Sequence, residues 1–313
     1  MKHVFLFQVH RDPELLDRIL KRLTSDDHYF VVNVDAKSDY SGFENVLSQT
    51  PNVVLVTRYN IMHGGFSQIS CTIKQFEACT QMGLFDYYHT ISGQDYPCVS
   101  NEVFDKWFED HAGRSYSMMD TLELVTEWRK EKYLKRLECW NFSDIFNHPI
   151  AIKLHLNGIA KRLFSGISRP YPDMDHIWGC WNWFSLSDKV VRYLLTSFAE
   201  DPAYVKRFKY TYCCDELIFS TKLYDKRDEL DIETFNSLRY VEWYPKRPCS
   251  GLPLVLDERE FVDIIHSGAF FCRKVTPEVS AKLLDLLDER SAAMSYHDIE
   301  EQHPKHPMLK TDN

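Results

Sequence analysis

Residues 92–95 read Ser-Gly-Gln-Asp and lie between an apolar run, 87–91, and Pro97. This pattern predicts a buried strand that ends in a tight turn, and α/β sheets bind their ligands at the carboxyl ends of such strands. The turn brings one carboxylate, that of Asp95, to the edge of the sheet. Divalent metals are held by several oxygen ligands, so a single carboxylate at this place bears on both the reaction and the cofactor.

A literal Asp-x-Asp pair occurs later in the chain, at Asp173 and Asp175, directly after Tyr171 and Pro172. A metal-binding pair needs a rigid strand end that fixes both carboxylates. No apolar run precedes these residues. We therefore interpret the pair as part of a loop and not as a metal site.

A second pair of acidic residues, Asp215 and Glu216, precedes an apolar helical run, 217–219. A glutamate in the first turn of a helix usually serves only as a favourable partner of the helix dipole. Inside a cleft, the same position would orient a general base, and Tyr210 and Tyr212 could form such a cleft. Both interpretations stay open on the residues alone.

Adjacent cations, Arg273 and Lys274, close an apolar run at 270–272. At a strand end, two such side chains could hold a diphosphate group by charge-assisted hydrogen bonds. An isolated Arg-Lys pair is also common on protein surfaces, so the dipeptide alone does not decide between a binding site and a solvated end.

Asp35 closes another apolar run, 29–34, and Gln8 and His10 follow the first run of the chain. A carboxylate at a strand end can accept hydrogen bonds from a base or a ribose, and it can equally form a turn. We expect Gln8 and His10 to lie beside Asp35, because the ends of neighbouring strands meet at one edge of the sheet.

Several function classes are disfavoured. The chain contains no Walker A loop and no G-x-G-x-x-G, H-E-x-x-H or G-x-S-x-G motif, which argues against an ATPase, a dinucleotide enzyme, a zincin and a serine hydrolase. Its net charge of -9 argues against a nucleic-acid partner. The 9 cysteines are scattered without a C-x-x-C pair, which indicates reduced thiols and no zinc site.

The first residues show no signal-peptide pattern, and no run approaches the roughly 20 apolar residues of a membrane span. We therefore expect a cytoplasmic protein. Residues 142–167 read as one or two amphipathic helices that carry Lys153, Lys161 and Arg162. This segment could be a solvated face, a lid, or a surface that rests on a membrane from its inner side.

The apolar runs alternate with helical patterns, which predicts an α/β sheet whose strand ends gather at one edge. The expected strands are 4–9, 29–34, 53–56 and 87–91, and the expected helices are one that begins at 12–14 and then 67–82, 126–140, 189–198, 215–224 and 277–290, the last with Thr276 as its cap. No Pro/Gly/Ser-rich linker occurs, so we expect one continuous domain over 1–313 with a loose tail after 296.

In order along the chain, these pieces resemble the core-2/I-branching β-1,6-N-acetylglucosaminyltransferase family, which includes the peptide O-xylosyltransferases. The resemblance covers about nine-tenths of the chain and is closest to a bacterial-type member. The matching segments are residues 9–13, 34–38, 63–67, 91–97, 183–187, 215–216, 240–243 and 271–274. Each motif is weak alone, whereas the ordered set is fairly specific.

The resemblance implies a GT-A-like nucleotide-sugar transferase fold, with a mixed central sheet flanked by helices. It divides the domain into a nucleotide-binding half, about 1–120, and an acceptor and catalytic half, about 121–295. It implies Glu216 as the general base and Lys274 as a ligand of the donor diphosphate. The other positions that it implies are Gln8, His10, Asp35 and His63 for the donor and Trp243 for the acceptor.

Two departures from the family pattern affect the site. Cys180 stands where the family usually has a serine, in the Gly-Cys-Trp-Asn-Trp run before Phe184, so the acceptor pocket is expected to differ. No arginine between Trp243 and Phe261 aligns cleanly with the family's second diphosphate ligand. Arg247 or Arg273 is expected to replace it, and Trp183 and Asp95 are expected to join Trp243 on the acceptor side.

The implied reaction is an inverting, metal-independent transfer from a UDP-sugar, with GlcNAc favoured and xylose as the other family donor. Fixed cations would stabilise the UDP leaving group without a metal cofactor. The expected acceptor is a hydroxyl of a glycan, a lipid-linked glycan or a protein, as in the synthesis of a surface polysaccharide. The alternatives are a metal-dependent nucleotidyltransferase and a non-catalytic carbohydrate- or nucleotide-binding protein.

Overall fold

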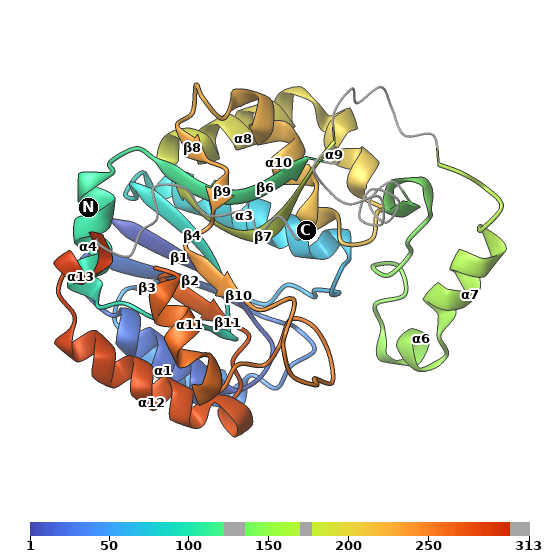
Figure 1. Cartoon of the computed structure of the whole chain (residues 1–313). Coiled ribbons are helices and arrows are strands. Elements are labelled where there is room, and N and C mark those ends of the chain that lie inside the picture. Colours follow the sequence, from blue (N-terminus) through green and yellow to red (C-terminus); the bar gives the residue numbers. More distant parts are fainter. Residues whose placement is uncertain (122–134, 170–176, 301–313) are drawn as a thin grey trace.

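The computed structural model describes residues 1–121, 135–169 and 177–300. Within these residues, one mixed sheet has eight strands in the order β3-β2-β1-β4-β7-β6-β8, with β9 paired to β6. Helices cover both faces of this sheet (Figure 1). The strands are β1 (His3–Val9), β2 (His28–Val34), β3 (Val53–Thr57), β4 (Tyr87–Ser92), β6 (Ser115–Thr121), β7 (Trp178–Ser187), β8 (Ile232–Glu233) and β9 (Phe235–Asn236).

The alternation of side chains along β1 creates two cores, one on each face of the sheet. Phe5 and Phe7 point into the first core, which packs against α1 (Pro13–Leu23) and α12 (Pro277–Ala293). Leu6 points into the second, which packs against α3 (Phe66–Met82) and α8 (Asp188–Glu200). In Figure 1, α1 and α12 accordingly lie on the opposite side of the sheet from α3 and α8. This arrangement confirms the predicted fold class.

The strand register places the predicted ligands at one edge. Strands β1, β2, β3 and β4 run parallel, with Val9 opposite Val34 and Gln8 opposite Ser92. The carboxyl ends of these strands therefore meet, and the residues that follow them surround the same space. The opposite edge holds the strand beginnings, including His3 and His28.

A small second sheet brings the cations Arg273 and Lys274 to this edge. Its order is β10 (Arg239–Val241), β11 (Phe271–Arg273) and β5 (Asp95–Pro97). Strand β11 is antiparallel to β5 and pairs Arg273 directly with Asp95. The strand end that carries the two cations thus lies against the turn that carries the single carboxylate, although Asp95 and Arg273 are 178 positions apart in the chain.

Most expected elements are confirmed, with corrections at the ends. The prediction missed α2 (Ser41–Gln49) and α4 (Asn101–Asp110). Residues 215–224 do not form one helix: α10 (Ile218–Leu223) is short and has a 3-10 turn on each side. The side chain of Thr276, before α12, accepts no capping hydrogen bond. The expected loose tail is wrong at its start, because α13 (His297–Glu300) buries Ile299 in the first core.

The middle of the chain forms α6 (Pro149–Lys153) and α7 (Leu156–Leu163), which lie to one side of the sheet (Figure 1). These are the two amphipathic helices expected in 142–167. Most of the basic helix expected at 126–140, the Asp173/Asp175 pair and the last part of the tail lie outside the described residues. The other described helices are α9 (Pro202–Phe208) and α11 (Phe261–His266). Among the described residues, none of the helices has both the length and the apolar composition to cross a membrane.

Candidate active site

A cavity of about 700 Å³ opens at the carboxyl edge of the parallel strands. Seven of the predicted site residues line its wall, and they come from five separate segments of the chain. They are Gln8, His10, Asp35, His63, Trp183, Arg273 and Lys274. The sheet therefore brings together most of the side chains that the sequence predicted to act together.

Arg273 is a buried cation of this wall that several neighbours hold in place. Its guanidinium donates to the Asp95 carboxylate at 2.8 Å and to Ser92 Oγ at 3.3 Å, and it lies 3.6 Å from the centre of the Trp183 ring. The second oxygen of Asp95 accepts from the Ser92 backbone N–H at 2.5 Å. Both carboxylate oxygens are thus engaged within the protein, and the charge of Asp95 serves to hold a buried arginine.

Lys274 presents the second cation to the cavity. Burial lowers the pKa of its ammonium, and the nearby Arg11 and Arg273 lower it further. Among the described residues, no carboxylate forms a hydrogen bond or an ion pair with the Lys274 ammonium. A cation that is partly desolvated and surrounded by other cations favours an anionic ligand, which would restore its preference for the charged form.

The part of the cavity that was predicted to hold the nucleotide is lined by polar side chains with fixed orientations. Asp35 accepts from the Lys37 backbone N–H at 2.8 Å and from the Lys37 ammonium at 3.0 Å. It therefore forms the turn that the sequence left as an alternative, while still facing the cavity. Gln8 donates to Thr72 Oγ1 at 2.9 Å, which fixes its amide at the end of β1.

His63 reaches the wall through a two-glycine turn. Gly64 has φ +70°, and a Cβ at this position would lie 2.6 Å from the Tyr212 ring. A Cβ on Gly65 would lie 2.3 Å from an oxygen of Asp144. The Asp144 carboxylate accepts hydrogen bonds from Ser67 at the start of α3. The glycines are thus required by close packing, and His63 is placed by a rigid turn.

The acidic pair places its two carboxylates differently. Asp215 lines the cavity with a buried Oδ1 that has no hydrogen-bond partner among the described residues, and its Oδ2 accepts from Gln68 at 3.3 Å. Burial raises the pKa of Asp215 to about 7, and the neighbouring Glu216 charge raises it as well. Glu216 does not line the cavity, and its carboxylate forms an ion pair with Arg136.

Three other predicted residues lie outside the described wall. Asp95 is buried beneath Arg273, as above. Arg247 is held by Asp257 and Glu260 at 3.0 and 3.1 Å, so its charge is already neutralised. Of the two arginines that were expected to act as the second cation, Arg273 lines the cavity and Arg247 does not. Trp243 is partly buried and its indole N–H has no partner among the described residues.

Several polar residues of the wall were not among the predicted site residues, and the larger ones include Arg11, Lys37, Gln68 and Asn182. Arg11 and Lys37 lie two and three residues after predicted strands, so their position near strand ends was a signal that could have found them. Gln68 lies one turn into α3, and only the packing of that helix end against the sheet brings it to the cavity.

A comparison with protein families assigns the chain to a class of enzymes. The model of the family described as "Core-2/I-Branching enzyme" matches residues 4–264, which is most of the chain. The protein therefore belongs to the Core-2/I-branching enzyme family, and the resemblance seen in the sequence is confirmed. Arg273 and Lys274 lie beyond the matched range, so their assignment rests on the cavity.

Similar curated proteins carry the name xylosyltransferase. Xylosyltransferase sqv-6 of Caenorhabditis briggsae is 21% identical over 97% of this chain and 38% of its own length. Xylosyltransferase 2 of Homo sapiens is 25% identical over 91% of this chain and 33% of its own length. The chain thus spans between a third and two fifths of these relatives. Family and relatives together support the prediction of a glycosyltransferase.

Among solved structures, a 4-diphosphocytidyl-2C-methyl-D-erythritol synthase aligns with 67% of this chain and 86% of its own, at 13% identity and a TM-score of 0.31. A similarity of this size adds nothing to the fold, which is defined by the strand order given above.

Proposed function

We propose that this protein transfers a sugar from a UDP-sugar to an acceptor hydroxyl with inversion at the anomeric carbon. The observation that carries the proposal is one cavity whose wall joins two cations, Arg273 and Lys274, to a buried carboxylate, Asp215. The cations suit the diphosphate of the donor, and the carboxylate suits the removal of a proton from the acceptor.

The departing UDP gains negative charge as the glycosidic bond to it breaks. Preorganised cations can stabilise that charge without a metal ion, since they need no reorganisation during the reaction. Asp95, the carboxylate at the turn, is engaged by Arg273 and by the Ser92 N–H, which leaves it poorly placed as a metal ligand. This engagement supports the proposal that the reaction needs no divalent metal.

The acceptor hydroxyl must lose its proton as it attacks from the face opposite the UDP. A positioned carboxylate typically contributes a factor of about 10²–10⁴ to such a step. The family resemblance assigns this role to Glu216. The position of Asp215 in the wall makes it the second candidate, because Glu216 is held by Arg136 outside the cavity.

The donor is proposed to be UDP-GlcNAc or UDP-xylose. GlcNAc follows from the resemblance, whereas the names of the relatives favour xylose. The acceptor is proposed to be a hydroxyl of a glycan, a lipid-linked glycan or a protein. The prediction of a cytoplasmic location stays a prediction.

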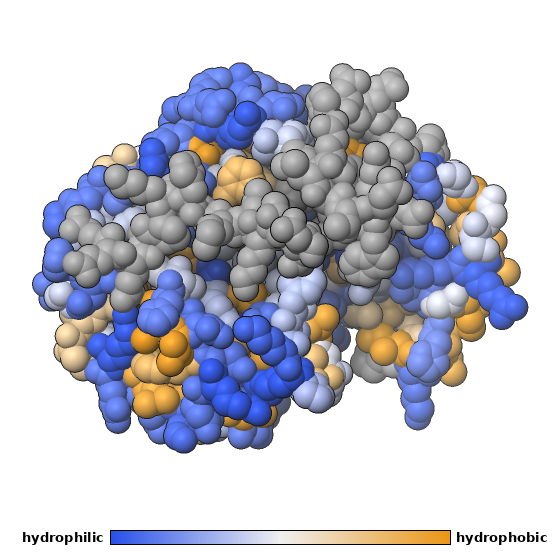
Figure 2. Space-filling view, in the orientation of Figure 1, coloured by the Kyte–Doolittle hydropathy of each residue, from blue (hydrophilic) through white to orange (hydrophobic). Residues whose placement is uncertain are grey.

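An apolar surface supports contact with the inner face of a membrane. Orange side chains gather over α6 and α7 in Figure 2. Ile150 is 64% exposed and Leu163 is 74% exposed, and Lys153, Lys161 and Arg162 lie in the same segment. Apolar side chains flanked by cations favour binding to the interface of an anionic bilayer, which is how a lipid-linked acceptor would be reached.

The test is the thermal stability of the protein with a panel of UDP-sugars, each measured in EDTA and in magnesium. A donor that binds the folded state raises Tm by mass action. We expect UDP-xylose or UDP-GlcNAc to raise Tm by the same amount in both media. A rise only in magnesium would instead favour the metal-dependent nucleotidyltransferase, and a rise without transfer to any hydroxyl acceptor would favour a binding protein.

A further inference from the structure

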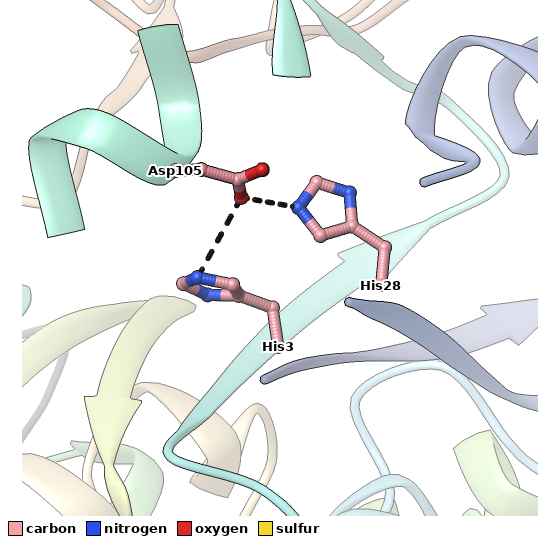
Figure 3. Close-up of side chains that lie close together, drawn as sticks. All are labelled: His3, His28 and Asp105. Carbon is pink, nitrogen blue, oxygen red and sulfur yellow. Dashed lines mark hydrogen bonds and ion pairs between the residues drawn. The ribbon is translucent and has the colours of Figure 1, made fainter. Parts of the chain in front are cut away.

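A cluster of buried histidines lies at the edge of the sheet opposite the cavity. His3 begins β1, His28 begins β2, and Asp105 comes from α4 (Figure 3). Their ligand atoms all lie within 4.8 Å of one another. Asp105 Oδ1 is 2.7 Å from His28 Nε2 and 3.7 Å from His3 Nε2, so both rings point at a single carboxylate oxygen.

The hydrogen bonds of His28 require a proton or a metal ion between its Nε2 and the Asp105 carboxylate. Its Nδ1 lies 2.7 Å from the backbone carbonyl of Leu23, which can only accept, so Nδ1 carries a hydrogen. In the neutral ring, Nε2 is then a lone pair that faces the Asp105 oxygen at 2.7 Å. Two lone pairs repel each other at this distance, and either a proton or a metal ion must lie between them.

The Nε2 atom of His3 lacks a hydrogen-bond partner in the described part of the chain. Its Nδ1 is 3.0 Å from His89 Nε2, and His89 Nδ1 is 2.8 Å from Ser185 Oγ. If the hydrogens run from His3 to His89 and on to Ser185, His3 Nε2 is a lone pair directed at Asp105. If they run in the reverse direction, His3 Nε2–H has its acceptor 3.7 Å away, which is too long for a hydrogen bond. In neither case has the buried His3 Nε2 a hydrogen-bond partner among the described residues.

We infer that His3, His28 and Asp105 bind a divalent transition metal of the zinc class. Two neutral imidazoles and a carboxylate are a common donor set for zinc, with bonds of about 2.0–2.2 Å. The contacts of the two Nδ1 atoms with Leu23 and His89 are the kind of outer hydrogen bonds that orient metal-binding histidines. One ion would satisfy both lone pairs and the carboxylate together.

The surroundings allow entry and a fourth ligand. The histidine side chains are fully buried, whereas the Asp105 side chain is 30% exposed. Asp105 lies on the outer side of the cluster, so a small outward movement of its carboxylate would make room for the ion, and a water could complete the coordination. The bound ion would tie β1, β2 and α4 together at the beginning of the sheet, which is a role in stability.

This inference is independent of the proposed function, because His3 and Gln8 lie at opposite ends of β1 and only Gln8 lines the cavity. Failure of donor binding would leave the metal site untouched, and failure of metal binding would leave the donor site untouched.

The experiment titrates the full-length protein, stripped with EDTA, with Zn²⁺ and with Co²⁺. The exposed thiols of Cys139 and Cys249 are alkylated first, since they could bind metal on their own. The readouts are metal content after gel filtration, the visible spectrum of bound Co²⁺, and Tm. The variants are His28→Gln and Asp105→Asn, with the exposed His266→Gln as the matched control.

We expect one metal per chain, a Co²⁺ spectrum of four-coordinate type and a higher Tm in the wild type and in His266→Gln. The two cluster variants should lose all three. Less than about a tenth of a metal per wild-type chain would overturn the inference and leave a proton as the cation between His28 and Asp105. Since that result concerns the wild type, it does not depend on the folding of any variant.

Discussion

Arg273 and Asp95 face each other across β11 and β5, and the guanidinium donates to the carboxylate at 2.8 Å. Both residues are buried, and the Trp183 ring stacks on the guanidinium face. The pair fixes the strand end that carries Lys274 against the turn of residues 92–95. Desolvation lowers the pKa of Arg273, and the Asp95 charge opposes that shift. The buried Asp95 carboxylate therefore helps to keep the Arg273 guanidinium charged at the cavity wall.

Asp95→Asn should destabilise the protein strongly. Removing one partner of a buried ion pair leaves the other charge unpaired and costs about 3–5 kcal/mol. Urea unfolding would measure the loss. Asp17→Asn is the matched control, because the Asp17–Lys21 pair is exposed and should contribute about 0–1 kcal/mol. Equal losses in the two variants would show that Arg273 does not depend on Asp95.

Substitution of each candidate base by its amide distinguishes Glu216 from Asp215. If Glu216 is the base, Glu216→Gln should reduce the rate of transfer at least about a hundredfold while UDP binding is kept. If Asp215 is the base, Asp215→Asn should show that loss instead, and Glu216→Gln should stay within a few fold of the wild type. Single-turnover transfer and UDP titration measure the two properties, with the exposed Glu278→Gln as control. Full activity in both variants would remove this turn from the reaction.

The Asp215 carboxyl also predicts how stability varies with pH. Its pKa in the folded protein is raised to about 7 by burial, from an unfolded value of 3.8. Between these two values the folded state holds the proton more tightly, so stability should fall as pH rises from 4 to 7. At about 1.4 kcal/mol per pKa unit, the contribution of this group could reach about 4 kcal/mol. In Asp215→Asn this part of the pH dependence should be absent, as urea unfolding at several pH values would show.

Lys274→Ala should weaken UDP far more than it weakens uridine. A charge-assisted hydrogen bond contributes about 1.5–3 kcal/mol, which corresponds to about a ten- to hundredfold loss in UDP affinity. Uridine has no phosphate, so its affinity should hardly change. Calorimetric titration of both ligands gives the comparison, and the exposed Lys282→Ala is the control. Equal weakening of UDP and uridine would place Lys274 away from the diphosphate.

The sequence predicted the position of several cavity residues because they stand at the ends of apolar runs. Gln8, Asp35 and Lys274 all stand at strand ends, and strand ends are visible in the pattern of a single segment. The ion pair of Arg247 was not predictable in this way. Its partners, Asp257 and Glu260, lie on a separate turn, and only the folded chain shows that they use its charge.

The acidic pair and the histidine cluster show the same limit. The sequence identified the position of Asp215 and Glu216, but only the folded chain, whose backbone turns at Cys213 with φ 48°, shows that Asp215 is the one that lines the cavity. His3 and His28 each stand one residue before an expected strand, and neither of them was assigned a role from the sequence. Only the parallel register of β1 and β2 places the two side by side, and only α4, which the sequence did not predict, brings Asp105 to them.

The last prediction concerns the apolar surface of α7. Leu163→Glu removes an exposed apolar side chain and adds a negative charge beside Arg162. Burying a leucine in a bilayer interface gains about 1.5–3 kcal/mol, so the variant should bind anionic vesicles at least about tenfold more weakly. Vesicle co-sedimentation at low and moderate salt measures this. Val279→Glu is the control, because Val279 is also exposed but lies on α12. Equal vesicle binding by the wild type and both variants would show that α7 does not contact the membrane.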